Sequence, residues 1–197
     1  MTALVDYGAG NLTSVKYAFA ALGVPVEVVR DASGVAAADR VVFPGVGAAG
    51  KAMENLRSRG LVEAVRAAAA EKPFLGICLG MQVLFARTEE DGGVDCLGLL
   101  EGTVKRFPDL PGFKVPEIGW NDVEPVGEAP ASVSGGREFY FVHSYFAPLV
   151  AETAGVSEYA GVRFSSMTRR GRFWACQFHP EKSGRAGLEL LKEWLSC

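Results

Sequence analysis

The sequence is poor in histidine and contains no long apolar run. Its 197 residues include only two histidines, so a histidine that acts as a general base could only be His143 or His179. No apolar stretch approaches the roughly 20 residues that a membrane-spanning helix requires. Residues 1–6 lack a basic region and reach an acidic residue early, which is unlike a secretory signal. We therefore expect no membrane contact and a cytoplasmic location.

The arrangement of the cysteines argues against a zinc ribbon and, in a reducing compartment, against a disulfide framework. Four cysteines are scattered along the chain, and no two of them form a C-x-x-C pair. A reactive thiol remains compatible with this pattern. We expect neither a metal nor another cofactor. The net charge is only -3 and no block of lysine and arginine stands out, so nucleic acid is not an expected partner.

The composition predicts one globular domain over residues 1–197. Hydrophobic residues make up 49 % of the chain and charged residues 22 %, which suits a single well-filled core rather than a disordered chain.

The first half of the chain alternates strand and helix patterns. Short segments rich in β-branched residues predict strands, and apolar residues at helical spacing predict helices between them. The strands are expected at residues 4–5, 26–29, 40–43 and 73–77, and the helices at 12–22 and 48–70, the latter interrupted near Gly60. Repeated β-α-β units predict an α/β fold, with a doubly wound, mostly parallel sheet flanked by helices. Sites in such folds lie beyond the carboxyl ends of the strands.

The second half changes character, with strand patterns separated by glycine and proline turns. We expect strands at residues 103–107, 138–142, 155–159, 162–164 and 172–178. These strands predict an additional antiparallel or mixed β layer beside the parallel sheet. The chain closes with a helix that carries Leu188, Leu191, Trp194 and Leu195 on one face.

Cys78 stands where a buried strand turns into a helix. Gly76 and Gly80 lie two residues to either side of it, which is the G-x-nucleophile-x-G elbow with cysteine in place of serine. Glycine is needed there because Cβ atoms would collide in so sharp a turn. The turn should lift the thiol into solvent above the sheet and direct backbone N–H groups toward it, which favours a thiolate and later an oxyanion. A buried structural cysteine at a tight junction is the alternative interpretation.

A second signal is the segment His179-Pro180-Glu181. Residues two apart point to the same side of an extended segment, and proline keeps this one out of a helix. Glu181 can then accept a hydrogen bond from one nitrogen of His179, which leaves the other nitrogen to act as a base toward a thiol. An ordinary strand-end turn is the alternative for this segment alone. Together with the Cys78 elbow, it predicts a catalytic triad.

These residues resemble the class I, or triad, glutamine amidotransferases. The resemblance rests on residues 76–82 and 179–181 and extends over essentially the whole chain, because Pro44-Gly45-Val46-Gly47 matches a glycine-rich strand–loop of that family. It implies the fold of that family, with Cys78 as nucleophile, His179 as acid and base and Glu181 as its orienter. It also implies backbone oxyanion and substrate contacts at Val46, Gly47 and Leu79, and side-chain or segment contacts to glutamine at Gln82, Ser144 and Tyr145. His143, just before Ser144, is expected to be structural.

A narrower resemblance is to the glutaminase subunits of imidazole glycerol phosphate synthase. It is carried by the opening D-Y-G-A-G-N-L at residues 6–12, by P-G-V-G-A at 44–48 and by I-G-W-N at 118–121. Two positions depart from the pattern, since Ala49 replaces a usual aromatic residue and Glu117 a usual histidine. Glu117 puts any role assigned to that surface in doubt. An N-cap is the simplest local role for Asn11.

The resemblance implies that glutamine is hydrolysed through a glutamyl thioester and that the ammonia feeds a separate cyclase with a (β/α)₈ barrel. The heterodimer would make imidazole glycerol phosphate and aminoimidazole carboxamide ribotide for histidine synthesis. Asn11, Trp120 and Lys182 are the candidate interface residues. Two alternatives remain open, namely the glutaminase of another ammonia-using synthase and a redox sensor of the same fold that uses Cys78 as its sensor thiol.

Overall fold

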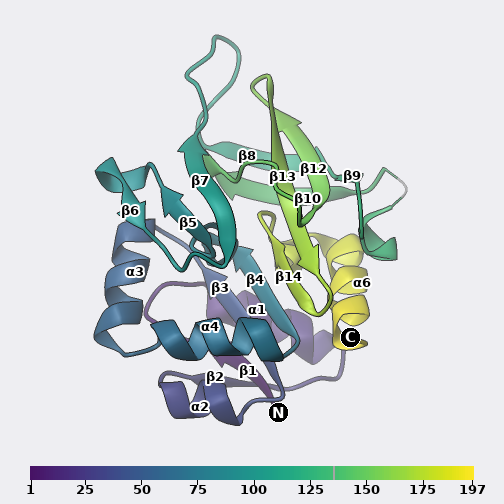
Figure 1. The fold of residues 1–197 in the computed structure, drawn as a ribbon. Helices are drawn as coiled ribbons and strands as arrows, with labels where there is room; N and C mark the ends of the chain where they lie inside the picture. Colours follow the sequence, from purple (N-terminus) through teal and green to yellow (C-terminus); the bar gives the residue numbers. More distant parts are fainter. Residues whose placement is uncertain (135) are drawn as a thin grey trace.

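A large twisted sheet forms the centre of the molecule (Figure 1). The computed structural model describes residues 1–134 and 136–197. The sheet has eight strands in the order β2-β1-β3-β4-β14-β13-β12-β9. The first five are parallel to one another, namely β2 (Val26–Val29), β1 (Thr2–Val5), β3 (Arg40–Gly45), β4 (Phe74–Cys78) and β14 (Phe173–Cys176). The other three continue antiparallel, namely β13 (Val162–Arg170), β12 (Thr153–Tyr159) and β9 (Glu124–Pro125).

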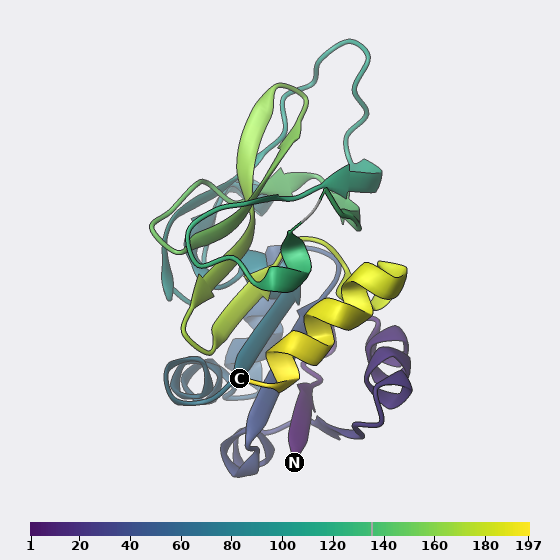
Figure 2. The same cartoon turned by 90° about the vertical axis from the view of Figure 1, so that its right-hand side faces the viewer.

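Helices cover both faces of the parallel part, which is why its central strands are buried from end to end. On one face lie α1 (Leu12–Ala21) and α6 (Gly184–Leu195), seen in purple and yellow in Figure 2. They bury Val15, Phe19 and Trp194 against the sheet. On the other face lie α3 (Ala49–Ser58), α4 (Val62–Glu71) and the short α2 (Ala32–Ala37).

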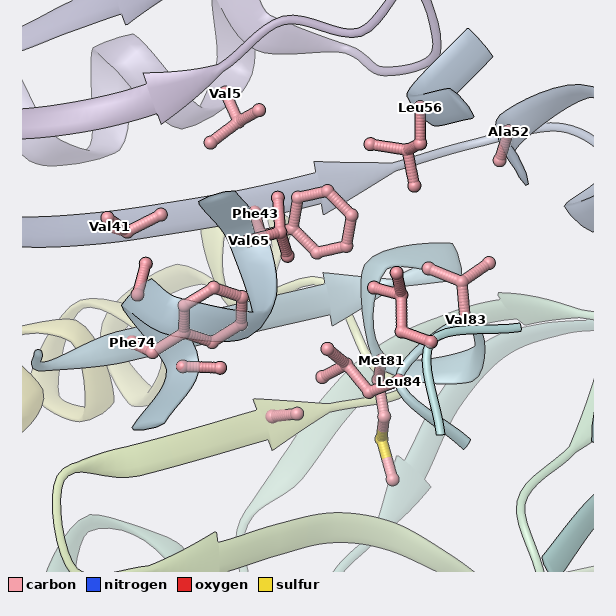
Figure 3. Packing of buried hydrophobic residues seen from close by; sticks show 14 of the residues in the cluster. Val5, Val41, Phe43, Ala52, Leu56, Val65, Phe74, Met81, Val83 and Leu84 are labelled. Atoms are coloured by element: carbon pink, nitrogen blue, oxygen red, sulfur yellow. The ribbon is translucent and has the colours of Figure 1, made fainter. Parts of the chain in front are cut away.

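The core on the α3 and α4 face is a continuous apolar cluster (Figure 3). Phe43 of β3 and Phe74 of β4 have ring centroids 5.9 Å apart. Leu56 of α3 and Val65 of α4 belong to the same cluster, and all four side chains are fully buried. Burying a side chain of this size stabilises the fold by about 1.5–3 kcal/mol relative to leaving it exposed. The apolar clusters on the two faces of the sheet hold the parallel strands in place. Side chains at the strand ends therefore have fixed positions.

Two smaller sheets lie beside the main one and close over the carboxyl ends of its parallel strands (Figure 1). One pairs β10 (Glu138–His143) with β8 (Glu117–Asp122) in antiparallel register. The other has the order β11-β7-β5-β6, formed by Tyr145–Phe146, Leu100–Arg106, Phe85–Thr88 and Val94–Asp95. Short helical turns complete the structure, namely α5 (Leu79–Gln82), η1 (Glu90–Gly92), η2 (Ala131–Val133) and η3 (Pro180–Lys182). Within the described residues, no helix is both long and apolar enough to cross a membrane.

The predicted fold class is confirmed, including the additional β layer. The strand at 26–29 has the predicted bounds, and the helix predicted at 48–70 is indeed two helices separated around Gly60. The prediction missed β5, β6, β8, β9 and β11. These strands are short or half-exposed, so their apolar pattern is weak. The last helix also differs in detail, because it buries Leu190 fully while Leu188 and Leu195 are only partly buried.

Candidate active site

Cys78 occupies a strained turn between β4 and α5. Its backbone has φ 55° and ψ -114°, a region that a residue with a side chain rarely adopts. The flanking glycines are required by close packing, as predicted. A Cβ on Gly80 would lie 2.0 Å from the carbonyl oxygen of Phe43, and one on Gly76 would lie 2.9 Å from Leu84 Cδ1. The expectation of a thiol lifted into solvent needs correction, because Cys78 is only 6 % exposed. Its side chain instead borders a cavity that is partly open to the surface.

That cavity has a volume of about 300 Å³ and opens between the main sheet and the two smaller ones. Cys78 and His179 both line it, so the structure brings together two residues that lie about 100 positions apart in the sequence. The predicted substrate contacts lie around the same cavity. They are Val46, Gly47, Leu79, Gln82, Ser144 and Tyr145. Val46 and Gly47 follow β3, Leu79 and Gln82 belong to α5 after β4, and Ser144 and Tyr145 lie where β10 leads into β11.

His179 is held by Glu181, as the spacing in the sequence predicts. The imidazole Nδ1 lies 2.7 Å from Oε1 of Glu181, and both side chains are at least 95 % buried. Burial disfavours the charged imidazole, but the interactions with Cys78 and Glu181 outweigh it and raise the pKa of His179 to about 10. Since Glu181 engages Nδ1, the other ring nitrogen remains for the thiol. This arrangement keeps the imidazole protonated beside the thiol.

Gln177 also belongs to the site, although the sequence pattern predicted no role for it. It is fully buried, and its Nε2 donates to Cys78 Sγ over 3.7 Å, while its Oε1 accepts from Gln82 Nε2 at 2.9 Å. Gln82 Nε2 also donates to the Tyr145 carbonyl at 2.8 Å. The position of Gln177, two residues before His179, could have predicted that the two side chains share one side of the segment.

Glu90 is the acidic side chain among the residues that line the cavity. It belongs to η1, and its Oε2 accepts a hydrogen bond of 2.7 Å from the N–H of Ala49 at the start of α3. Burial raises the pKa of this carboxyl group. No pattern in the sequence distinguishes Glu90, because Glu89-Glu90-Asp91-Gly92 has the composition of a solvated turn.

His143 lines the cavity too, but both of its ring nitrogens are engaged elsewhere. Nδ1 lies 2.8 Å from the carbonyl oxygen of Tyr145, and Nε2 lies 2.9 Å from Oε2 of Glu117. His143 therefore has no nitrogen left for Cys78. The assignment of Glu117 to a surface was wrong, because this residue is only 3 % exposed. The strand register explains it, since His143 of β10 lies directly opposite Glu117 of β8.

The three candidate interface residues lie outside the catalytic centre or at its border. Asn11 caps α1, with Oδ1 accepting from the N–H of Ser14 at 3.4 Å, as predicted. Trp120 is 54 % exposed, and its ring centroid lies 6.0 Å from that of Tyr140. Lys182 lines the cavity and holds Nζ 6.0 Å from the same Tyr140 ring. Tyr140 thus links Trp120 to Lys182.

Comparison with known proteins defines the class. Residues 3–196 match the family profile described as "Glutamine amidotransferase class-I". A solved glutamine amidotransferase has the same fold with a TM-score of 0.74 and 22 % identity, covering 98 % of this chain and 97 % of that chain. PurLQS from Thermotoga maritima gives a TM-score of 0.69 at 16 % identity, covering 99 % and 97 %. The chain belongs to the class I glutamine amidotransferase family.

Within this family, the chain is similar to members that share one name. Relatives in Moorella thermoacetica and Xanthomonas euvesicatoria are named imidazole glycerol phosphate synthase subunit HisH. The first is 49 % identical, with 98 % of this chain and 92 % of the relative covered, and the second is 46 % identical, with 98 % and 96 % covered. The HisH subunit of Herpetosiphon aurantiacus is 48 % identical, with 99 % and 93 % covered. The narrower resemblance found in the sequence is therefore confirmed.

Proposed function

We propose that this chain is the glutaminase subunit of imidazole glycerol phosphate synthase and that it hydrolyses glutamine with Cys78, His179 and Glu181. One observation carries the proposal. The thiol at the strained end of β4 shares a cavity with an imidazole whose other nitrogen is held 2.7 Å from a buried carboxylate. That is the nucleophile, base and orienter arrangement of covalent amide hydrolysis.

In the proposed reaction, the Cys78 thiolate attacks the carbon of the side-chain amide and a C–S bond forms. The negative charge moves to the amide oxygen, which the N–H of Leu79 and the backbone of Val46 and Gly47 would stabilise. His179 transfers its proton to the amide nitrogen, the C–N bond breaks, and ammonia leaves a glutamyl thioester. Water then attacks the thioester while His179 takes its proton. The C–S bond breaks, and glutamate is released with the thiolate and imidazolium restored.

The amino acid end of glutamine would lie against the far wall of the cavity. Glu90 is suited to the α-ammonium group, because it is an acidic side chain already fixed by the N–H of Ala49. The side-chain N–H groups of Gln82 donate to Tyr145 and Gln177. Its side-chain carbonyl oxygen is therefore the atom that would accept a hydrogen bond from the substrate. The α-carboxylate would then bind at Ser144 and Tyr145. The cavity volume of about 300 Å³ suits a ligand of this size.

We further propose that the ammonia passes to a cyclase with a (β/α)₈ barrel in a heterodimer, in which the chain acts as one domain of residues 1–197 in the cytoplasm. The HisH names of the relatives support a place in histidine synthesis. Asn11, Trp120 and Lys182 are the proposed interface. Trp120 is a large exposed aromatic side chain, the kind that anchors protein interfaces. Packing of α1 against η3 places the helix capped by Asn11 next to the turn that carries Lys182.

A diazoketone analogue of glutamine tests the nucleophile. The protein is treated with it alone and with the candidate cyclase, and the adduct is mapped by mass spectrometry. We expect one adduct at Cys78 that excess glutamine prevents. Cys78→Ala should abolish it and ammonia release, whereas the control Cys197→Ser should keep both. Oxidation of Cys78 by peroxide with no ammonia release in any partner mixture would contradict the glutaminase and favour the redox sensor.

A further inference from the structure

A second histidine–glutamate pair lies next to the proposed triad and has no part in the reaction described above. His143 and Glu117 come from adjacent strands, β10 and β8, and their side chains are 2 % and 4 % exposed. His143 Nε2 and Glu117 Oε2 are 2.9 Å apart, as an ion-pair contact rather than an aligned hydrogen bond. Neither atom has another partner in the described part of the chain. Acidic side chains are almost never so deeply buried unless they are paired, so the two side chains depend on each other.

The contacts of His143 define where its protons lie. A carbonyl oxygen can only accept, so the 2.8 Å contact with Tyr145 requires a proton on Nδ1. If Nε2 carried none, its lone pair would face a carboxylate oxygen at 2.9 Å, and two acceptors would repel each other. The pair therefore contains one proton more than a neutral imidazole beside an ionised carboxylate.

The surroundings fix both members of the pair in place. Phe107, Phe141 and Phe164 surround His143 with ring centroids at 5.2, 5.6 and 5.3 Å, and they shield the contact with Glu117 from water. Glu117 Oε1 accepts a hydrogen bond of 2.8 Å from Asn121 Nδ2, which holds the carboxylate opposite the ring. A proton between Nε2 and Oε2 is thus what the contact requires.

The pair is connected to the nucleophile through hydrogen bonds. The Tyr145 carbonyl accepts from His143 on one side and from Gln82 on the other, each at 2.8 Å. Gln82 then donates to Gln177, which donates to Cys78 Sγ. A carbonyl that accepts two hydrogen bonds has little freedom to rotate. The position of the Tyr145 peptide therefore depends on His143, and the position of His143 depends on Glu117.

We propose that His143 and Glu117 are positioning residues, which share a buried proton and so hold the Tyr145 peptide in the orientation that binds glutamine. This proposal deepens the proposed function and rests on it, since Ser144 and Tyr145 are the expected contacts of the α-carboxylate. It also gives a role to the glutamate at position 117. A neutral residue without a donor there would leave Nε2 unpartnered and free the ring to turn.

Other titratable groups face this region from several elements. The groups that share its cavity or pack on its aromatic rings are Cys78 after β4, Glu90 of η1, Tyr145 of β11, Tyr159 of β12, and His179 and Lys182 at η3. A kinetic pH profile would mix their effects with those of the pair. A direct measurement on His143 avoids that problem.

Nitrogen-15 NMR of the imidazole rings tests the shared proton without any assay of activity. The protein has two histidines, so His179→Gln leaves a single ring to observe. At pH 7.5 we expect both nitrogens of His143 to be protonated, and we expect Glu117→Gln to convert the ring to the neutral form with its proton on Nδ1. A wild-type ring with only one protonated nitrogen would overturn the shared proton, whether or not the protein hydrolyses glutamine.

Steady-state glutamine hydrolysis with the cyclase present tests the positioning role. Leaving one buried polar atom unpaired should raise KM for glutamine about 5- to 30-fold in Glu117→Leu, with kcat changed less than about threefold. Glu117→Gln can donate to Nε2 and accept from Asn121, so its KM should return to within about twofold of wild type. The exposed Glu101→Gln serves as the control and should match wild type.

The outcomes separate the two proposals. An equal KM for Glu117→Leu and wild type, or a failure of Glu117→Gln to restore KM, would overturn the positioning role while the glutaminase stands. Absence of glutamine hydrolysis in the wild type, with His143 doubly protonated, would overturn the proposed function and leave the buried pair intact.

Discussion

At the scale of the residue, the two histidines differ in what their nitrogens contact. Nδ1 of His179 contacts Glu181, and the other ring nitrogen is on the side of Cys78. His143 has one nitrogen on a carbonyl oxygen and the other on Glu117. Burial and a carboxylate neighbour are common to both, so neither property alone identifies a catalytic base. The nitrogen left free decides which histidine can exchange a proton with substrate.

Glu181→Gln keeps the size of the side chain and removes its charge. We expect the pKa of His179 to fall below its wild-type value of about 10, because one of the two groups that raise it is lost. We also expect kcat to fall on the order of 10²- to 10⁴-fold, as in other triads that lose the orienting carboxylate. KM should hardly change. The measurements are histidine NMR titration and ammonia release, with the exposed Glu71→Gln as the control. An unchanged kcat would remove Glu181 from the triad.

At the scale of the element, the site is assembled from the ends of neighbouring parallel strands. Gly45 at the end of β3 pairs with Cys78 at the end of β4, and Cys176 at the end of β14 pairs with Ile77. The loop with Val46, the turn with Cys78 and the segment with His179 therefore leave the sheet side by side. This is the general location of sites in doubly wound folds. Crowding at these ends makes the exact spacing of β3 and β4 important.

Gly80→Ala should disturb that spacing. The added Cβ would lie 2.0 Å from the Phe43 carbonyl oxygen, and backbone in the middle of a buried sheet cannot move away cheaply. We expect a loss of about 1–3 kcal/mol or more in the free energy of unfolding, together with loss of glutamine hydrolysis. Urea denaturation gives the first quantity.

Gly50→Ala is the matched control, because its Cβ would meet the exposed side chain of Asp91 at 2.6 Å, and that side chain can turn away. Alanine also favours the helix in which Gly50 lies. A Gly80→Ala protein as stable as Gly50→Ala would show that β3 and β4 can separate without cost.

At the scale of the whole molecule, three sheets border the cavity proposed as the reaction site. Its lining comes from the ends of β3 and β4, from the segment after β14 and from β10 and β11 of the smaller sheets. The proposed triad is therefore buried and partly shielded from water, which strengthens its electrostatic interactions. Burial of other titratable side chains makes the stability of the fold depend on pH.

Stability should fall as pH rises above about 8.5. Burial raises the pKa of Cys96 to about 11 and that of Cys176 well above its usual value, whereas both thiols lose their protons near pH 8.5 in the unfolded chain. The folded chain thus binds more protons above pH 8.5, and its free energy of unfolding drops by up to about 1.4 kcal/mol per pH unit for each thiol.

Urea denaturation at a series of pH values from 7.5 to 10 measures this slope. Cys96→Ala should lower the slope above pH 8.5, because it removes one of the two buried thiols. Equal slopes for Cys96→Ala and wild type would mean that the folded Cys96 thiol has an ordinary pKa.

The sequence by itself determined the fold class, the helix–strand order of the first half and the elbow at Cys78, because each is a local pattern of apolar spacing or of glycines around a turn. It also predicted the bond between His179 and Glu181, since residues two apart in an extended segment share a side. Only the tertiary structure decided that Glu90, Gln177 and the pair of His143 with Glu117 belong to the same region. Their contacts depend on strand register and on which strand ends meet, and neither is encoded in the periodicity of one segment.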